Sequence, residues 1–193
     1  MKNRREKNSM FFSISLTVIF SLVSTFTATS ESVRQQLPPP GRVEIRTVEP
    51  FVYCSLSRSG SFSEIMEAAG ELIQNMHLQN IFPMGPMIGI FHGDPNLSDP
   101  EKMQWELGFP ISEQAQVLAP LEKKVWTFTT VAVSVHQGPY DQTGETILKM
   151  QEWLEENGYV QNGPILERYL DPEPSRLSSS SLRTEIWIPC RKS

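Results

Sequence analysis

The second half of this chain repeats the pattern of its first half, and no other feature of the sequence constrains the fold as much. When Gly85 is placed over Gly163, a shift of 78 residues, glycines, aromatic residues and Gly-Pro turns coincide in one order. The matched pairs are Gly60 with Gly138, Phe62 with Tyr140, Met76 with Leu154, and Phe91 with Tyr169. With one extra residue, WELGFPI at 105–111 falls on TEIWIPC at 184–190. Repetition of this kind predicts two copies of one structural unit, at about residues 42–112 and 122–190.

Each copy predicts the same order of elements, β-α-β-β. A β-rich segment comes first, at 43–57 and again at 125–136. An amphipathic helix follows, and its apolar residues in the first copy are Phe62, Ile65, Met66, Ala69, Ile73 and Met76. Two strands complete the unit. We therefore expect an α+β domain in which an antiparallel sheet carries two helices on one face, with the copies related by a pseudo-two-fold axis and a ligand groove between the helices.

The first thirty residues differ from the rest of the chain. Four basic residues precede an uncharged, mostly apolar stretch at 10–26, which ends in small residues. This pattern is typical of a secretory signal peptide. The alternative is an uncleaved N-terminal anchor that associates with a membrane through residues 10–26. We expect an exported protein, periplasmic, secreted or membrane-anchored, with a linker at 31–41 and the domain at 42–193.

Charge and motifs exclude several classes of function. Without its first thirty residues the chain has 13 Lys and Arg against 21 Asp and Glu, a net charge of −8. An acidic body argues against nucleic acid binding and favours cationic ligands. The sequence has no metal-binding spacing of Cys and His, no nucleophile elbow and no nucleotide-binding loop, so we expect no metal and no cofactor. Whether Cys54 and Cys190 pair is left open by the sequence.

Several motifs, in this order, resemble those of the GyrI-like domain, also called the AraC effector-binding domain. They are GPMIGIFHGDP at 85–95, WELGFPI, Gly138-Pro139-Tyr140, EENGY at 155–159, GPILERYLDP at 163–172, and TEIWIPC. The resemblance covers about residues 41–190. It implies two SHS2-like modules around a cleft that binds small cationic or amphipathic molecules, as in multidrug binding. Regulators of this family carry a helix-turn-helix domain before the module, whereas this chain carries the apolar segment, so we expect a free-standing exported member.

The resemblance also implies where the ligand binds. Family members place a glutamate in the cleft after a Gly-Pro turn, and Glu167 matches that position, with Tyr169 as an aromatic wall. Gly89 occupies the equivalent position in the first copy, so that one copy would supply charge and the other space. Aromatic walls would add cation–π contacts. The remaining candidates for the cleft are Tyr140, Phe91 and Trp105.

Simpler explanations exist for each candidate. Glu167 could be a solvated strand carboxylate, Phe91 and Trp105 could be core residues, and Tyr140 could anchor its helix. Glu106 and Glu185 occupy matching places in the two copies, which favours a structural role for both.

Three functions are compatible with these features. The first is a binding protein for an amphipathic or cationic small molecule. The second is a hydrolase of strained or electrophilic small molecules, in which Glu167 activates water. The third, because SOUL-type haem-binding proteins have a related fold, is non-covalent binding of a tetrapyrrole.

Overall fold

The computed structural model of the protein describes residues 37–60, 64–93, 103–171 and 174–193. The predicted signal peptide and most of the predicted linker lie outside these residues. Among the described residues, no helix is both long enough and apolar enough to span a membrane.

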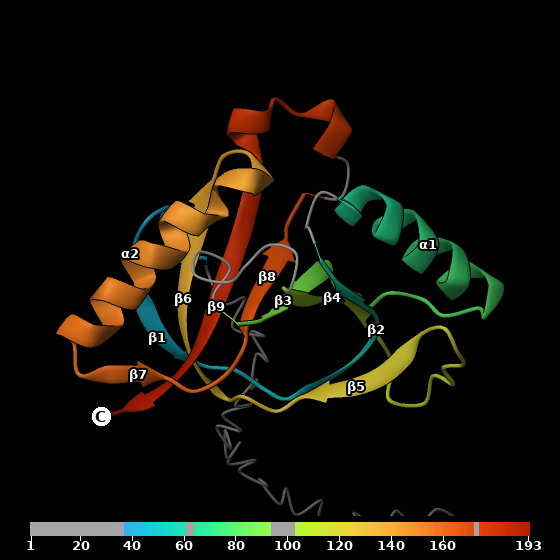
Figure 1. Cartoon of the computed structure of the whole chain (residues 1–193), viewed down its shortest axis with the longest axis horizontal. Helices are drawn as coiled ribbons and strands as arrows, with labels where there is room; N and C mark the ends of the chain where they lie inside the picture. The colour runs from blue at the N-terminus through green and yellow to red at the C-terminus, as the bar shows by residue number, and fades with distance from the viewer. Residues whose placement is uncertain (1–36, 61–63, 94–102, 172–173) are drawn as a thin grey trace, which may run out of the picture. The chain divides into compact units, whose positions relative to one another are not determined.

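The described strands form one antiparallel sheet, in the order β1-β6-β9-β8-β3-β4-β2-β5, with β7 paired to β9 (Figure 1). The two copies of the repeat meet at its centre, where β8 lies beside β3. The strands are β1 (Glu44–Thr47), β2 (Phe51–Ser59), β3 (Met87–His92), β4 (Gln104–Pro110), β5 (Glu122–Trp126), β6 (Thr130–Gln137), β7 (Tyr159–Gln161), β8 (Ile165–Tyr169) and β9 (Arg183–Lys192).

Each predicted β-rich segment divides into two strands, which pair in different halves of the sheet. In the first copy Pro50 lies in the break between β1 and β2, where its missing N–H would cost a ladder hydrogen bond. The first strand of each copy pairs with the other copy, β1 with β6 and β5 with β2. The sequence does not predict this exchange.

The strand registers of the two copies correspond. At the centre of the sheet Met87 lies opposite Tyr169, and Phe91 lies opposite Ile165, so a shift of 78 residues converts one pair into the other. The pair Gly89 and Glu167 converts into itself. This register is compatible with a two-fold relation between the copies, with the axis between Gly89 and Glu167.

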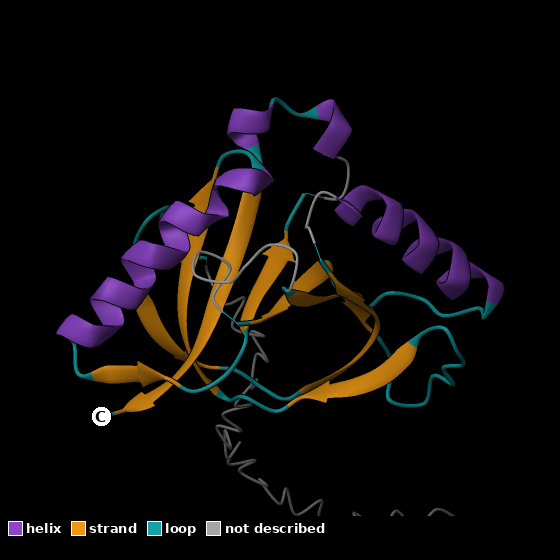
Figure 2. Cartoon of the chain, viewed as in Figure 1, coloured by secondary structure: helices purple, strands orange, loops and turns teal. Residues whose placement is uncertain are grey.

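Both helices, α1 (Ile65–Leu78) and α2 (Thr143–Glu156), flank the central strands (Figure 2). Their buried side chains belong to one hydrophobic cluster with the strands, so both helices cover the same face of the sheet. The structure therefore confirms the predicted α+β class. The helix residues in this cluster are Ala68, Leu72, Met76, Ile147, Met150 and Leu154.

The buried side of α1 differs from the predicted one. Met66 and Ile73, placed by the sequence on the apolar stripe, are 79% and 54% exposed, whereas Ala68 and Leu72 are buried. Apolar residues occur on both sides of this helix, so periodicity alone did not identify the buried side.

The opposite face of the sheet has a second hydrophobic cluster, which includes Trp187. The rings of Phe51 on β2 and Trp187 on β9 are 6.4 Å apart between centroids, although three strands separate β2 from β9. The sheet therefore curls around this cluster. Cys54 and Cys190 are buried free thiols in the cluster under the helices.

Candidate functional site

Glu167 lies on β8 at the centre of the sheet, on the face that the helices cover. Ile165 and Tyr169 lie two residues before and after it on the same strand and therefore on the same face, and both pack in the cluster under the helices. Its exposed fraction is only 2%, so it is not the solvated carboxylate of the simpler explanation.

Two hydroxyl groups lie next to the Glu167 carboxylate. The Tyr169 hydroxyl donates to Oε2 at 3.0 Å. The Thr143 hydroxyl, at the start of α2, is within reach of both this carboxylate and the Tyr140 carbonyl. Burial raises the pKa of Glu167 to about 7, against the opposing effect of these hydrogen bonds. The same burial, together with the nearby Glu167 charge, raises the pKa of Tyr169.

Gly89 supplies the predicted space opposite Glu167, but the Tyr169 hydroxyl fills that space. A Cβ atom at Gly89 would lie 2.8 Å from the Tyr169 hydroxyl oxygen and 3.4 Å from the Phe91 ring. The absent side chain therefore allows Tyr169 to reach Glu167.

Tyr140 begins the short helical turn before α2, and its ring meets that of Tyr169 edge-on at 5.1 Å between centroids. Its hydroxyl is buried without a hydrogen-bond partner among the described residues, as are those of Ser134 and Thr184. Thr184 lies opposite Tyr169, and Ser134 lies opposite Ile186, the neighbour of Glu167 on β9. The face that carries Glu167 thus has hydrogen-bonding capacity that a ligand or water could satisfy.

Phe91 and Trp105, the other two candidates, are core residues. Both are buried in the cluster under the helices, and the Trp105 indole N–H donates to the Gly60 carbonyl at 3.2 Å. They support the floor of the sheet beside α1.

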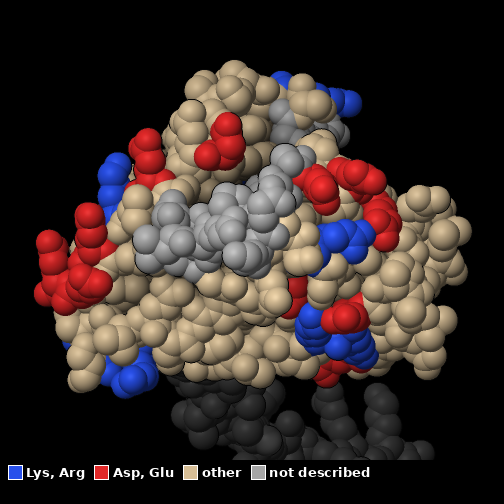
Figure 3. All heavy atoms as spheres, in the orientation of Figure 1, with Lys and Arg blue, Asp and Glu red and all other residues tan. Residues whose placement is uncertain are grey.

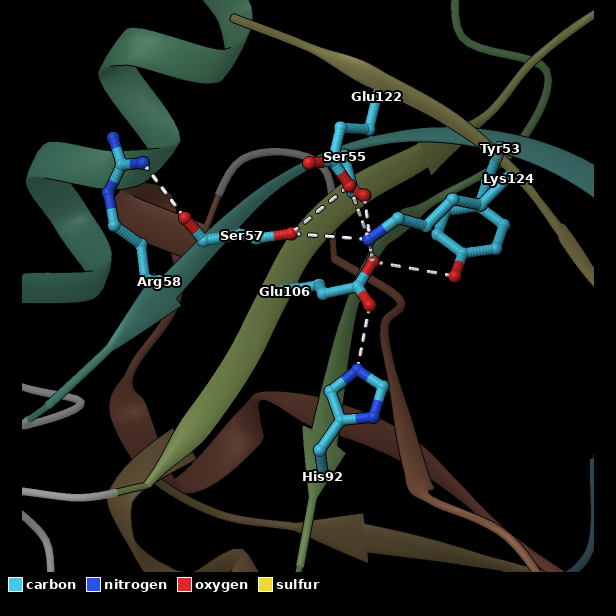
Figure 4. Close-up of polar contacts among 8 residues, drawn as sticks. All are labelled: Tyr53, Ser55, Ser57, Arg58, His92, Glu106, Glu122 and Lys124. Atoms are coloured by element: carbon cyan, nitrogen blue, oxygen red, sulfur yellow. Dashed lines mark hydrogen bonds and ion pairs between the residues drawn. The ribbon is translucent and has the colours of Figure 1, made fainter.

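A second buried carboxylate, Glu106 on β4, lies on the opposite face of the sheet (Figure 4). Its Oε1 is 2.7 Å from Nε2 of His92. Its Oε2 lies 2.8 Å from the Ser55 hydroxyl and 3.0 Å from Lys124 Nζ. Although burial raises the pKa of Glu106, hydrogen bonds from Ser55, His92 and Lys124 lower it overall.

The matching carboxylate of the second copy, Glu185, is paired with two arginines. Arg46 on β1 and Arg168 on β8 both contact it, and the Arg168 guanidinium lies 4.9 Å from the centroid of the Trp187 ring. Arg46 and Lys124 occupy equivalent positions of the repeat, so the exchanged strand supplies one cation to each cluster. The repeat in the sequence matches the two glutamates but does not reveal their partners. A shift of 78 residues places Arg46 on Lys124, so the repeat could have pointed to these two partners.

The sequence pattern of the GyrI-like small molecule binding domain matches residues 42–191. The chain belongs to the GyrI-like family. No protein with a curated description matches the sequence.

Solved structures share the fold of this GyrI-like domain. The EcmrR C-terminal domain matches with a TM-score of 0.71 and 18% identity, over 79% of this chain and 98% of that one. The chain spans 58% of EcmrR in its complex with DNA. A hydrolase from Listeria innocua matches with a TM-score of 0.62 and 12% identity, over 83% and 97% of the two chains. SAV2435 bound to tetraphenylphosphonium matches with a TM-score of 0.55 and 13% identity, over 78% and 94%.

Two hollows in the described surface of the GyrI-like domain lie away from Glu167. One, of about 450 Å³, adjoins Glu106. The other, of about 280 Å³, is lined by apolar residues such as Ile73, Phe82 and Phe109. Residues 72–93, which supply most of this second hollow, include no Lys, Arg, Asp or Glu. Figure 3 shows the surface near the C-terminus of α1 without any of these charged residues. No group of His, Cys, Asp and Glu suited to a metal ion occurs within the described ranges.

Proposed function

We propose that this GyrI-like domain binds an amphipathic cation on the helix-covered face of its sheet, and that Glu167 is the carboxylate that recognises the positive charge. The family establishes small-molecule binding in general. The observation that supports the finer proposal is the buried Glu167, which has two hydroxyl partners and no cationic partner among the described residues.

A buried carboxylate is costly unless a cation or several donors stabilise it. Glu106 and Glu185 each have cationic partners, whereas hydroxyl groups alone face Glu167. A cationic ligand would supply the missing charge, and the rings of Tyr140 and Tyr169 would contact its apolar groups. Because Glu167 is almost fully buried, the side chains above it must move to admit the ligand.

The fold-level neighbours are compatible with this proposal. SAV2435 binds tetraphenylphosphonium, an amphipathic cation, and shares the fold. Hydrolysis is the alternative, favoured by a pKa of Glu167 near neutrality, which suits a general base.

The test compares two ions of one shape and opposite charge, tetraphenylphosphonium and tetraphenylborate, by thermal unfolding of the protein. Binding to the native state raises the melting temperature, by the equivalent of about 2.7 kcal/mol at a hundred times the Kd. We expect the cation alone to stabilise the protein, and Glu167→Gln to remove the effect. Glu113→Gln, at an exposed site, should leave it unchanged. Equal responses to both ions, or an unchanged response in Glu167→Gln, would refute the role of Glu167.

A visible absorbance band of the purified protein would favour a tetrapyrrole instead.

We also propose that the protein is exported and that it binds no nucleic acid. The basic, apolar and small-residue segments before residue 31 support export, and the acidic body supports the second statement. Export is tested by recovery of the protein from outside the cytoplasm and by its mass. Cleavage after the small residues would shorten the chain by about thirty residues.

A further inference from the structure

The hollow beside Glu106 lies at the ends of β2, β3 and β4, mainly on the side of the sheet that the helices do not cover. Its volume is about 450 Å³. It is therefore distinct from the region around Glu167. Its lining consists of Ser57, Arg58, Ser59, His92, Gln104, Trp105, Glu106 and Lys124.

The charges around this hollow already have partners of opposite charge. Lys124 Nζ lies 3.0 Å from Glu106 and 2.7 Å from Glu122. Arg58 turns away toward α1 (Figure 4), and it pairs with Glu71 on that helix. An ionic ligand would therefore have to compete with an existing partner at each charge.

The remaining polar groups are neutral and can both donate and accept hydrogen bonds. They are the hydroxyls of Ser57 and Ser59 and the amide of Gln104. The Ser57 hydroxyl accepts from Lys124 Nζ at 3.2 Å and donates weakly to Glu122 at 3.5 Å, so a ligand would have to share it with these two residues. His92 adds a directed acceptor. Its Nε2 lies 2.7 Å from the Glu106 carboxylate, and its Nδ1 has no hydrogen-bond partner in the described part of the chain. In the tautomer whose Nε2–H donates to Glu106, Nδ1 is an acceptor.

The second copy shows that a buried glutamate at this position needs neither the Ser57 hydroxyl nor the His92 ring. At the positions of Ser57 and His92 it has Val135 and Leu170, and two arginines hold Glu185. The fold thus carries the same carboxylate without the serine or the histidine. Ser57 and His92 therefore distinguish the first copy, although both also contact its charged cluster.

We propose that this hollow is a second ligand site, which binds a neutral, hydroxyl-rich small molecule such as a sugar or polyol. Each hydroxyl group of such a ligand donates one hydrogen bond and accepts others. It would donate to Nδ1 of His92, accept from Ser59 and Gln104, and compete with Glu122 for the Ser57 hydroxyl. The site is independent of Glu167 and of the amphipathic cation proposed there.

The experiment follows the ring signals of His92 by NMR in ¹⁵N-histidine-labelled full-length protein. The probes are methyl glucoside and myo-inositol, with inorganic phosphate and methylammonium as charged arms. The key variant is Ser57→Val with His92→Leu, the residues of the second copy. Because this variant lacks His92, its binding is measured by saturation transfer to the probe. Tetraphenylphosphonium binding serves as the control for the helix-covered face.

We expect a saturable shift of the His92 signals with at least one hydroxylated probe, and at least tenfold weaker binding in the double variant. Tetraphenylphosphonium should affect both proteins equally. Binding of phosphate or methylammonium in place of the hydroxylated probes would overturn the proposal. So would unchanged binding in the double variant, or no response to either sugar probe at concentrations up to tens of millimolar.

Discussion

At the scale of single residues, Glu167 combines a titratable group with near-complete burial. Burial disfavours its charged form, so the folded protein holds this proton to a higher pH than the unfolded chain does. The pKa rises from an ordinary value of 4.5 to about 7 on folding. Between these values the folded state binds more protons, and its stability falls as the pH rises.

This difference predicts a pH-dependent contribution to stability. Between pH 4.5 and 7 the free energy of unfolding should lose about 3 kcal/mol on account of Glu167, and the loss should be complete above pH 7. Glu167→Gln should remove that part of the decline. Urea unfolding at pH 5 and pH 8 measures it as the difference between the two proteins. An equal loss of unfolding free energy between pH 5 and pH 8 in the two proteins would show that Glu167 titrates as an exposed carboxylate.

Gly89 predicts a second residue-scale effect. In Gly89→Ala the new Cβ meets the Tyr169 hydroxyl at 2.8 Å, so the hydroxyl must leave Glu167. We expect a loss of about 1–3 kcal/mol in the free energy of unfolding. Gly70→Ala is the control, because a Cβ there meets nothing within 4 Å and an alanine favours the helix. In a Tyr169→Phe background the cost of Gly89→Ala should shrink, and a cost that stays the same would locate the strain elsewhere.

At the scale of elements, β1 and β5 each carry one cation into the half of the sheet formed by the other copy. Arg46 reaches Glu185, and Lys124 reaches Glu106. Each cation also contacts a glutamate two residues earlier on its own strand, Glu44 or Glu122. The exchange of strands therefore serves to neutralise a buried carboxylate.

Lys124→Met tests this role. Removal of the lysine leaves Glu106 with Ser55, Tyr53 and His92, and it should lower the free energy of unfolding by about 1–3 kcal/mol. Lys123→Met is the matched control on the same strand, because Lys123 Nζ donates to the exposed carbonyls of Glu113 and Ala115. Its effect should stay within about 0.5 kcal/mol. Equal effects of the two substitutions in urea unfolding would contradict the assigned role.

The sequence predicted the fold class because turns and aromatic residues repeat over long segments. It missed the exchange of β1 and β5, since pairing partners far apart in the chain leave no local signal. It made Glu167 a candidate through the family resemblance, but it could not show that Tyr169 fills the space at Gly89. The cluster around Glu106 joins residues from β2, β3, β4 and β5, so no single stretch of sequence contains it.

At the scale of the whole molecule, the described sheet depends on both copies. The copies meet through β3 and β8 at the centre, and they also exchange β1 and β5. The helices of both copies share one hydrophobic cluster. Neither copy by itself therefore has a complete core.

We expect residues 42–112 and 122–190 to remain unfolded as separate peptides and to gain sheet structure when mixed. Each alone would expose its half of the shared cluster and would lack the strand that its partner supplies. Circular dichroism of the two peptides and of their equimolar mixture measures this. Cooperative unfolding of one peptide alone would show that a single copy is a complete folding unit.

The position of Gly89 opposite Glu167 has a consequence for how such a chain can evolve. In a homodimer of identical subunits, a residue on the symmetry axis faces its own copy. A glutamate there would face a second glutamate across the strand pair, with about 5 Å between the two Cβ atoms and with the two carboxylates side by side. Their mutual repulsion would oppose the ionisation of both. Two units joined in one polypeptide escape that restriction, because each codon changes independently. Covalent linkage thus allows a single carboxylate to occupy the axis, facing a residue that has no side chain.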